Sequence, residues 1–140
     1  MILTRGLIGA KFILVIKMAM VEKVNHIFEP NPLACGQAVI AMLSGVDVYK
    51  IIDMAGTERE TTLNDMKRLF KILDINLCEN RVQITEKERL PQYALLSLET
   101  PKCWHWSLYF EGKFYDPEYG VLDDFPPTNR RYYWEIKNDV

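Results

Sequence analysis

The sequence predicts a single α+β domain in which helices come first and an antiparallel sheet follows. A length of 140 residues is typical of one domain. With 49% hydrophobic and 26% charged residues, the composition is that of a globular protein, which argues against disordered, collagen-like and coiled-coil classes. Apolar residues recur at helical spacing up to Asp74, and beyond it they form short aromatic and aliphatic runs separated by turn signals. This order is typical of an α+β domain.

The N-terminal residues 1–24 are set apart as an extension or a first strand. The segment 6–21 is mostly apolar, but Lys11 and Lys17 interrupt it. Its longest unbroken apolar run, residues 12–16, is far shorter than the ~20 residues that a membrane-spanning helix needs. No small-residue cleavage site of a secretion signal follows. We therefore expect neither a membrane span nor export.

The segment 35–46 predicts a helix at the centre of the domain. It contains no charged residue, and its letters CGQAVIAMLSG are apolar around most of the helical circumference. A helix of this kind is buried on several sides. Gly45 is expected to end it, because glycine readily adopts the left-handed conformation that follows many helices.

Two amphipathic helices are expected next. Asp47 can cap the first of them, which ends at Gly56. Its apolar stripe contains Val48, Ile51, Ile52 and Ala55. Thr62 and Asp65 resemble a capping box at the start of the second helix. The apolar face of that helix contains Leu63, Met66, Phe70 and Leu73.

Four strands are expected in the second half of the chain. They cover residues 94–98, 104–110, 113–115 and 132–136. Glu111 and Gly112 form a plausible two-residue turn between the second and third of these strands. With this turn, facing residues have numbers that sum to 223, which places Ser107 opposite Asp116. A three-residue loop would reverse which residues share a face.

The charge balance and the cysteines limit the classes of function. The 17 basic and 19 acidic residues give a net charge of −2, so there is no positive excess with which to bind a nucleic acid backbone. The cysteines, Cys35, Cys78 and Cys103, are odd in number and form no CxxC pair. Free thiols in a reducing compartment, the cytoplasm, are therefore expected.

Cys35 has the sequence position of a catalytic nucleophile. It follows Pro30 and Pro32 and begins the long apolar helix. Proteins commonly activate thiols at helix N-termini, where backbone N–H groups are unsatisfied, and the N–H of Cys35 itself would face a developing oxyanion. The alternative is a small buried core residue, which is what most free cysteines are.

His105 is the candidate base. It lies in the expected second strand and shares a face with Ser107. The predicted pairing makes Asp116 a diagonal neighbour of His105 on this face, close enough to orient the imidazole ring. The alternative is a core histidine that is satisfied by a backbone carbonyl. His26, the other histidine, has no comparable partner in the sequence.

Three short motifs resemble those of papain-like cysteine peptidases. NPLACG followed by AVIAMLSG, at 31–36 and 38–45, resembles the helix that carries the nucleophile. His105 with Trp106 resembles the histidine strand, and YDPEYG at 115–120 resembles the Asp-Pro-x-x-Gly turn. The motifs occur in the family's order of Cys, His, Asp, with 70 residues from Cys to His. The resemblance is closest to the peptidases that remove double-glycine leader peptides from bacteriocins and to their stand-alone relatives.

The resemblance implies that residues 25–140 form a papain-like cysteine peptidase domain, with the nucleophile on a buried central helix and the N-terminal helices packed on a C-terminal antiparallel sheet. Cys35 would be the nucleophile, His105 the base and Asp116 the residue that orients the imidazole. The expected reaction is hydrolysis of a peptide or amide bond in a peptide or protein substrate, without a metal or organic cofactor. The family's leader peptidases are often fused to transporters, and the length of this chain leads us to expect a stand-alone protein.

Glu29 departs from the family pattern. The family usually carries a glutamine six residues before the nucleophile, and its carboxamide N–H completes the oxyanion hole. An ionised carboxylate cannot donate a hydrogen bond and repels an oxyanion. The resemblance therefore implies an oxyanion site made by the backbone N–H of Cys35 with either a protonated Glu29 or Asn31. Gln37, inside the helix, is a less natural substitute.

Three other functions remain open. A protein deamidase or transamidase would use the same triad, since only the substrate cleft differs. A catalytically impaired binding module is favoured by Glu29 and disfavoured by the complete triad. A metal site would combine Cys103 and His105 with Cys35 or Cys78, although the Cys-x-His spacing is unusual for zinc ligands.

Overall fold

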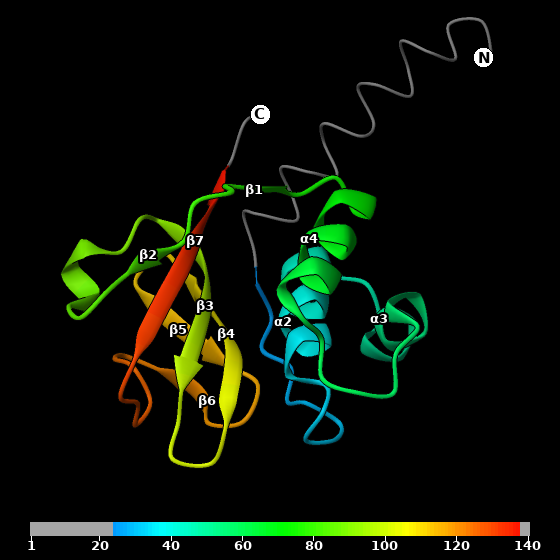
Figure 1. Cartoon of the computed structure of the whole chain (residues 1–140), viewed down its shortest axis with the longest axis horizontal. Coiled ribbons are helices and arrows are strands. Elements are labelled where there is room, and N and C mark those ends of the chain that lie inside the picture. The colour runs from blue at the N-terminus through cyan, green and yellow to red at the C-terminus, as the bar shows by residue number, and fades with distance from the viewer. Residues whose placement is uncertain (1–23, 138–140) are drawn as a thin grey trace, which may run out of the picture.

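The computed structural model describes residues 24–137, which form one α+β domain with three α-helices and a seven-stranded antiparallel sheet (Figure 1). The helices are α2 (Cys35–Ser44), α3 (Val48–Ala55) and α4 (Leu63–Ile72). The strands are β1 (Asn76–Leu77), β2 (Val82–Gln83), β3 (Tyr93–Glu99), β4 (Trp104–Phe110), β5 (Lys113–Asp116), β6 (Gly120–Leu122) and β7 (Arg131–Lys137), and a short 3-10 helix, η1 (Lys87–Arg89), precedes β3. The predicted α+β class is confirmed. The expected extension or strand over residues 1–24 lies outside the described residues, apart from Val24.

The central helix α2 forms where the uncharged segment predicted it. All of its residues are buried, which explains why no position in it carries a charge. Gly45 follows in the left-handed conformation, with φ of 76°, and its N–H donates to the carbonyl of Ala41. The predicted helix end is therefore confirmed.

Side-chain caps start the next two helices as predicted. The Asp47 carboxylate accepts hydrogen bonds from two backbone N–H groups in the first turn of α3. At the start of α4, the Thr62 hydroxyl accepts from the N–H of Asp65 at 3.2 Å, and the Asp65 carboxylate accepts from the N–H of Thr62 at 2.8 Å. These reciprocal bonds make a capping box.

The sheet has the strand order β1-β7-β3-β4-β5-β6, and β2 also pairs with β7. The last strand of the chain, β7, therefore lies in the interior of the sheet, between β1 and β3. The four predicted strands are confirmed, three of them with slightly wider bounds. The strands β1, β2 and β6 were not predicted, because segments of two or three residues are too short to show an alternating pattern.

The turn between β4 and β5 has the predicted length. Glu111 and Gly112 have φ of 46° and 87°, as a two-residue hairpin turn requires. Leu108 pairs with Tyr115, and the remaining pairs keep the same register. The face assignment of His105 and Asp116 depends on this register.

Apolar side chains pack on both faces of the sheet. The larger cluster joins the helices to one face, which includes Leu95 of β3 and Leu108 of β4. In Figure 1 the helices stand together beside the sheet, with α2 nearest to β4. On the other face of β3, Ala94, Leu96 and Leu98 form a smaller cluster with Phe114 of β5. Because β4 is covered on both faces, its polar residues are buried as well.

Gly36 allows the start of α2 to approach the sheet closely. A Cβ atom at this position would overlap the hydroxyl of Thr61 and would lie 2.7 Å from Met66 Sδ and 3.0 Å from Trp106 Cδ1. Only a residue without a side chain fits there. This close approach brings Cys35 next to β4.

Candidate active site

Cys35 is the first residue of α2, and its side chain is only 3% exposed. The backbone N–H of Trp106 in β4 donates to its Sγ atom at 3.5 Å. The helix is preceded by Ala34, which provides no side-chain cap, so the N–H groups of the first turn remain beside the thiol. The sulfur thus lies between a helix N-terminus and the strand that carries His105.

His105 and Asp116 are joined directly. The Nε2–H of His105 donates to Asp116 Oδ1 at 2.8 Å, and both side chains are almost completely buried. Their strands, β4 and β5, are neighbours in the sheet, so the diagonal contact expected from the hairpin register is present. The alternative of a core histidine bonded to a backbone carbonyl does not describe His105.

Asp116 is held by four hydrogen bonds and is completely buried. Besides His105, its carboxylate accepts from the Ser107 hydroxyl at 2.7 Å and from the backbone N–H groups of Glu118 and Tyr119 at 2.9 and 3.0 Å. Burial alone raises the pKa of Asp116, but these bonds and the charge of His105 outweigh it and hold the pKa below its ordinary value. Asp116 is therefore an ionised and rigidly oriented partner for the imidazole.

The imidazole of His105 is biased toward its charged form. Burial lowers the pKa of His105, but hydrogen bonding to Asp116 and to Cys35 outweighs burial and raises the pKa to about 10. Because Nε2 is bonded to Asp116, Nδ1 is the ring nitrogen left for Cys35. The imidazole of His105 is thus bonded to Asp116 and lies close to the thiol of Cys35.

Glu29 reaches the same place from the segment before α2. The donor atoms of Glu29, Cys35 and His105 all lie within 4.8 Å of one another. The backbone N–H of Glu29 donates to the carbonyl of Pro117 at 2.9 Å, which ties this segment to the turn after β5. Its Oε1 atom is buried and has no hydrogen-bond partner among residues 24–137.

The surroundings of Glu29 raise the pKa of its carboxyl group above the ordinary value. Burial is the main cause of this rise in the pKa of Glu29. The positive charge of His105 lowers the pKa, and the negative charges of Glu118 and Asp116 raise it further. A protonated carboxyl can donate a hydrogen bond, whereas an ionised one only accepts.

Asn31 lies elsewhere. It is exposed, and its Oδ1 accepts from the backbone N–H of Leu33 at 2.9 Å in the turn before α2. It also lines a pocket of about 380 Å³ together with Gln37 and residues 57–59. Of the two residues expected at the oxyanion site, the structure thus brings Glu29 next to the thiol and places Asn31 in a neighbouring surface turn.

Two further residues support the site without having been predicted. The Nε2 atom of His26 bonds to the backbone carbonyl of Asp116 at 2.7 Å, whereas His105 bonds to the carboxylate of the same residue. No sequence signal indicates this contact, because the two residues are 90 positions apart. The ring of Tyr119 lies edge-on to His105 with a centroid separation of 6.4 Å. Ser107 was predictable, since the register places it opposite Asp116.

The other cysteines do not join the site. Cys103 is exposed and Cys78 is half-buried. Within the part of the chain that the structure describes, one group of three potential metal-ligating side chains occurs, and it consists of Glu29, Cys35 and His105. The metal site expected as an alternative, with Cys103 and His105, is therefore not formed.

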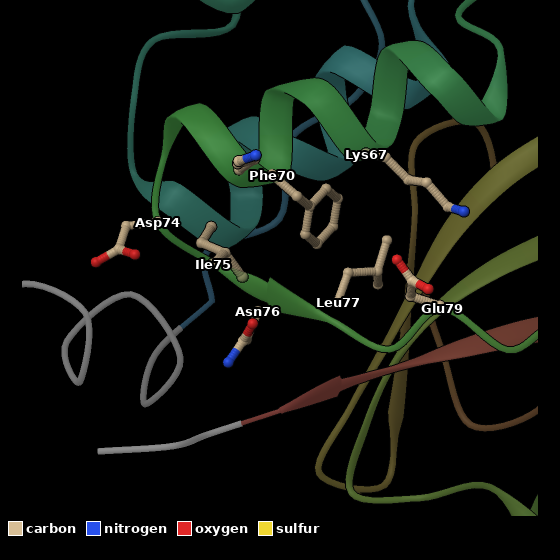
Figure 2. Close-up of a pocket in the computed structure, with 8 residues that line it drawn as sticks. Lys67, Phe70, Asp74, Ile75, Asn76, Leu77 and Glu79 are labelled. Carbon is tan, nitrogen blue, oxygen red and sulfur yellow. The ribbon is translucent and has the colours of Figure 1, made fainter.

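A separate pocket of about 320 Å³ lies between α4 and β1 (Figure 2). Its lining consists of Lys67, Phe70, Lys71, Asp74, Ile75, Asn76, Leu77 and Glu79. None of these side chains is a thiol or an imidazole. This pocket does not include the residues around Cys35.

Comparison of the chain with protein-family models, with curated proteins and with solved structures finds no match. Among residues 24–137, no helix has the length and apolar character needed to cross a membrane. The chemistry open to the site follows from its own geometry, in which a thiol at a helix N-terminus meets a buried imidazole held by a buried carboxylate. In proteins, an arrangement of this kind is used for nucleophilic catalysis by cysteine.

Proposed function

We propose that the protein is a thiol hydrolase that cleaves a peptide or amide bond through Cys35, His105 and Asp116 on a papain-like fold. The observation that carries this proposal is the buried 2.8 Å bond between His105 and Asp116, with the thiol of Cys35 on the other side of the imidazole. A nucleophile, a base and a group that orients the base are the parts that covalent acyl transfer requires.

The first half of the reaction forms a thioester. The Cys35 proton passes to Nδ1 of His105, and the thiolate sulfur forms a bond to the carbonyl carbon of the substrate. When the tetrahedral intermediate collapses, the C–N bond breaks and His105 donates its proton to the leaving amine. Asp116 stabilises the imidazolium throughout and keeps its Nε2–H pointed away from the sulfur.

The second half releases the acid. His105 takes a proton from water, whose oxygen attacks the thioester carbon. The C–S bond then breaks, and Cys35 recovers a proton from His105. No metal or organic cofactor enters these steps.

The oxyanion site is formed by the N–H groups at the start of α2 and by Glu29. A protonated Glu29 donates a hydrogen bond to the oxyanion, as the family's glutamine does, and the burial that raises the pKa of Glu29 supports this role. In its ionised form Glu29 would oppose the reaction, and the protein would then be a binding module with an intact triad.

We propose a peptide or protein substrate and a reducing compartment. The cysteines of the described residues are all free, as in cytoplasmic proteins. The net charge of −2 gives no support for a nucleic acid partner.

The test is reaction with an irreversible thiol-directed peptidase inhibitor near neutral pH, followed by mapping of the modified residue. We expect Cys35 to react first although it is buried, because it has an imidazole partner. Cys103 is the matched control: it is exposed, yet burial of its sulfur and the charge of Glu60 raise its pKa. First modification of Cys78 or Cys103, or an unchanged Cys35 rate in His105→Ala, would overturn the proposal.

A further inference from the structure

We propose that Glu29, Cys35 and His105 together bind one divalent transition metal ion of the zinc class, which blocks the thiol. The binding itself rests on the geometry of these side chains. Its consequence, reversible inhibition of the site, rests on the proposed function.

The three donor atoms are of the kinds that zinc prefers. A thiolate, an imidazole nitrogen and a carboxylate oxygen lie within 4.8 Å of one another. In a tetrahedral site with ligands at about 2.0–2.3 Å, neighbouring donors are about 3.3–3.8 Å apart. Side-chain movements of no more than about 1–1.5 Å would therefore close the three donors around an ion. The fourth position would be left to water.

The residues that hydrogen-bond to the ligating side chains already have the arrangement found in metal sites. Ligating histidines usually donate their second ring N–H to a carboxylate, which fixes the ring and its tautomer. His105 does this through Nε2, which is 2.8 Å from Asp116 Oδ1, and Nδ1 is left for the ion. Asp116 is fixed in turn by its bond from Ser107.

Glu29 provides the third ligand. Its Oε1 atom is buried and has no partner within residues 24–137, and a buried polar atom without a partner is costly. Apart from His105, the charged groups that act on Glu29 most strongly are all acidic: Glu118, Asp116 and Glu60. A dication would satisfy the free oxygen and neutralise part of this negative charge.

Binding changes the chemistry of the sulfur. The Cys35–His105 pair releases one proton to solvent when the Sγ–metal bond forms, and a protonated Glu29 releases a second when its carboxylate binds. The lone pair that would attack a carbonyl is then held by the metal. Thiolate ligation selects zinc, cobalt or copper ions over magnesium and calcium, which prefer oxygen ligands. A glutamine in place of Glu29 would leave only the sulfur and the nitrogen as strong ligands.

The direct experiment is titration of the full chain, freed of metal with a chelator, with Co²⁺ as a spectroscopic probe. We expect one equivalent to bind, with a sulfur-to-cobalt charge-transfer band and the visible bands of a tetrahedral site, and Zn²⁺ to displace it. Glu29→Gln, which is nearly identical in size, should weaken Co²⁺ binding by at least about 10–100-fold. Losses of this size occur even when the residue replaced only hydrogen-bonds to a metal ligand. Cys35→Ala should remove the charge-transfer band, and the Cys78→Ser/Cys103→Ser double variant should leave binding unchanged.

A second measurement does not depend on the folding of any variant. Zn²⁺ should protect Cys35 of the wild-type chain from alkylation, a chelator should restore the reaction, and Mg²⁺ should have no effect. The inference is overturned if no stoichiometric binding occurs, if Glu29→Gln binds as tightly as the wild type, or if the double variant loses the site. Alkylation of the metal-free chain separates the two proposals. If Cys35 is unreactive but the chain binds Co²⁺, only the proposed hydrolase is contradicted. If Cys35 is reactive but the chain binds no metal, only the metal site is contradicted.

Discussion

The sheet side and the helix side of Cys35 differ in how completely their polar atoms are satisfied. On the sheet side, the carboxylate of Asp116 accepts four hydrogen bonds. On the helix side, three buried oxygen atoms have no partner within the described chain: Glu29 Oε1, Gln37 Oε1 and Thr61 Oγ1. Buried polar atoms are nearly always paired, because an unpaired one costs about 1–3 kcal/mol.

This difference indicates that the two sides of the site have different roles. The sheet side fixes the imidazole of His105 in one orientation before a substrate arrives, as a precise catalytic geometry requires. The helix side keeps bonding capacity that the fold itself does not use. The same chemical change should therefore have opposite effects on the two sides.

The largest effect is expected for Asp116→Asn. This change removes a charge with little change in size, so the imidazolium loses its stabilising partner and the ring can adopt the wrong tautomer. We expect hydrolysis to fall by about 10³–10⁴-fold, together with a clear drop in the rate of Cys35 alkylation. Asp123→Asn is the matched control, because Asp123 is exposed and its carboxylate pairs with Lys113 on the surface. Equal rates in the two variants would remove Asp116 from the mechanism.

The same carboxylate-to-amide change at Glu29 should act in the other direction. Glu29→Gln supplies an N–H donor to the oxyanion at every pH. At a pH where Glu29 is ionised, the change also removes a negative charge and is then worth about 2.7–4 kcal/mol in the transition state, or about 10²–10³-fold in rate. The measurement is hydrolysis of a general peptide or ester substrate in the presence of a chelator, with Cys35→Ala as the blank and the exposed Glu86→Gln as the control. A lower rate would show that the carboxyl group itself assists catalysis, and an unchanged rate would show that Glu29 does not contact the oxyanion.

Removal of one hydroxyl group from each side should have a smaller effect, which can be measured as a change in the free energy of unfolding. Ser107→Ala deletes the 2.7 Å bond to the charged Asp116 and should lower the free energy of unfolding by about 1.5–3 kcal/mol. Thr61→Val deletes a hydroxyl that has no partner among residues 24–137 and should be neutral or slightly stabilising. Denaturant unfolding of both variants makes the comparison, and similar losses would mean that the Thr61 hydroxyl is in fact bonded.

The smallest effect, counted per pH unit, is expected in the dependence of the unfolding free energy on pH. The pKa of His105 is raised to about 10, above the value of about 6.5 in an unfolded chain, so the folded protein keeps a proton that the unfolded chain releases. The stability that His105 contributes is complete below about pH 6.5 and is lost as the pH rises toward 10, by less than about 1.4 kcal/mol per pH unit. The measurement is the difference in unfolding free energy between wild type and His105→Ala in chelator, and a difference that grows with pH would contradict it.

Much of the fold was predictable because its signals are local. The uncharged segment of α2, the capping box of Thr62 and Asp65, and the Glu111–Gly112 turn each depend on residues a few positions apart. The turn in particular fixed the hairpin register, and through it the pairing of His105 with Asp116. The pairing of two of the three candidate triad residues therefore followed from a two-residue turn.

What only the tertiary structure decided involves segments that are distant in sequence. The place of β7 inside the sheet, the bond from His26 to the carbonyl of Asp116 and the position of Glu29 against Cys35 and His105 all depend on how separate elements pack. The sequence alone determined the helices, the longer strands and the residue types of the site, since period, caps and turn chemistry act over one or two turns of chain. The tertiary structure decided which polar atoms are satisfied and which stay open, because that depends on packing between segments that no local pattern encodes.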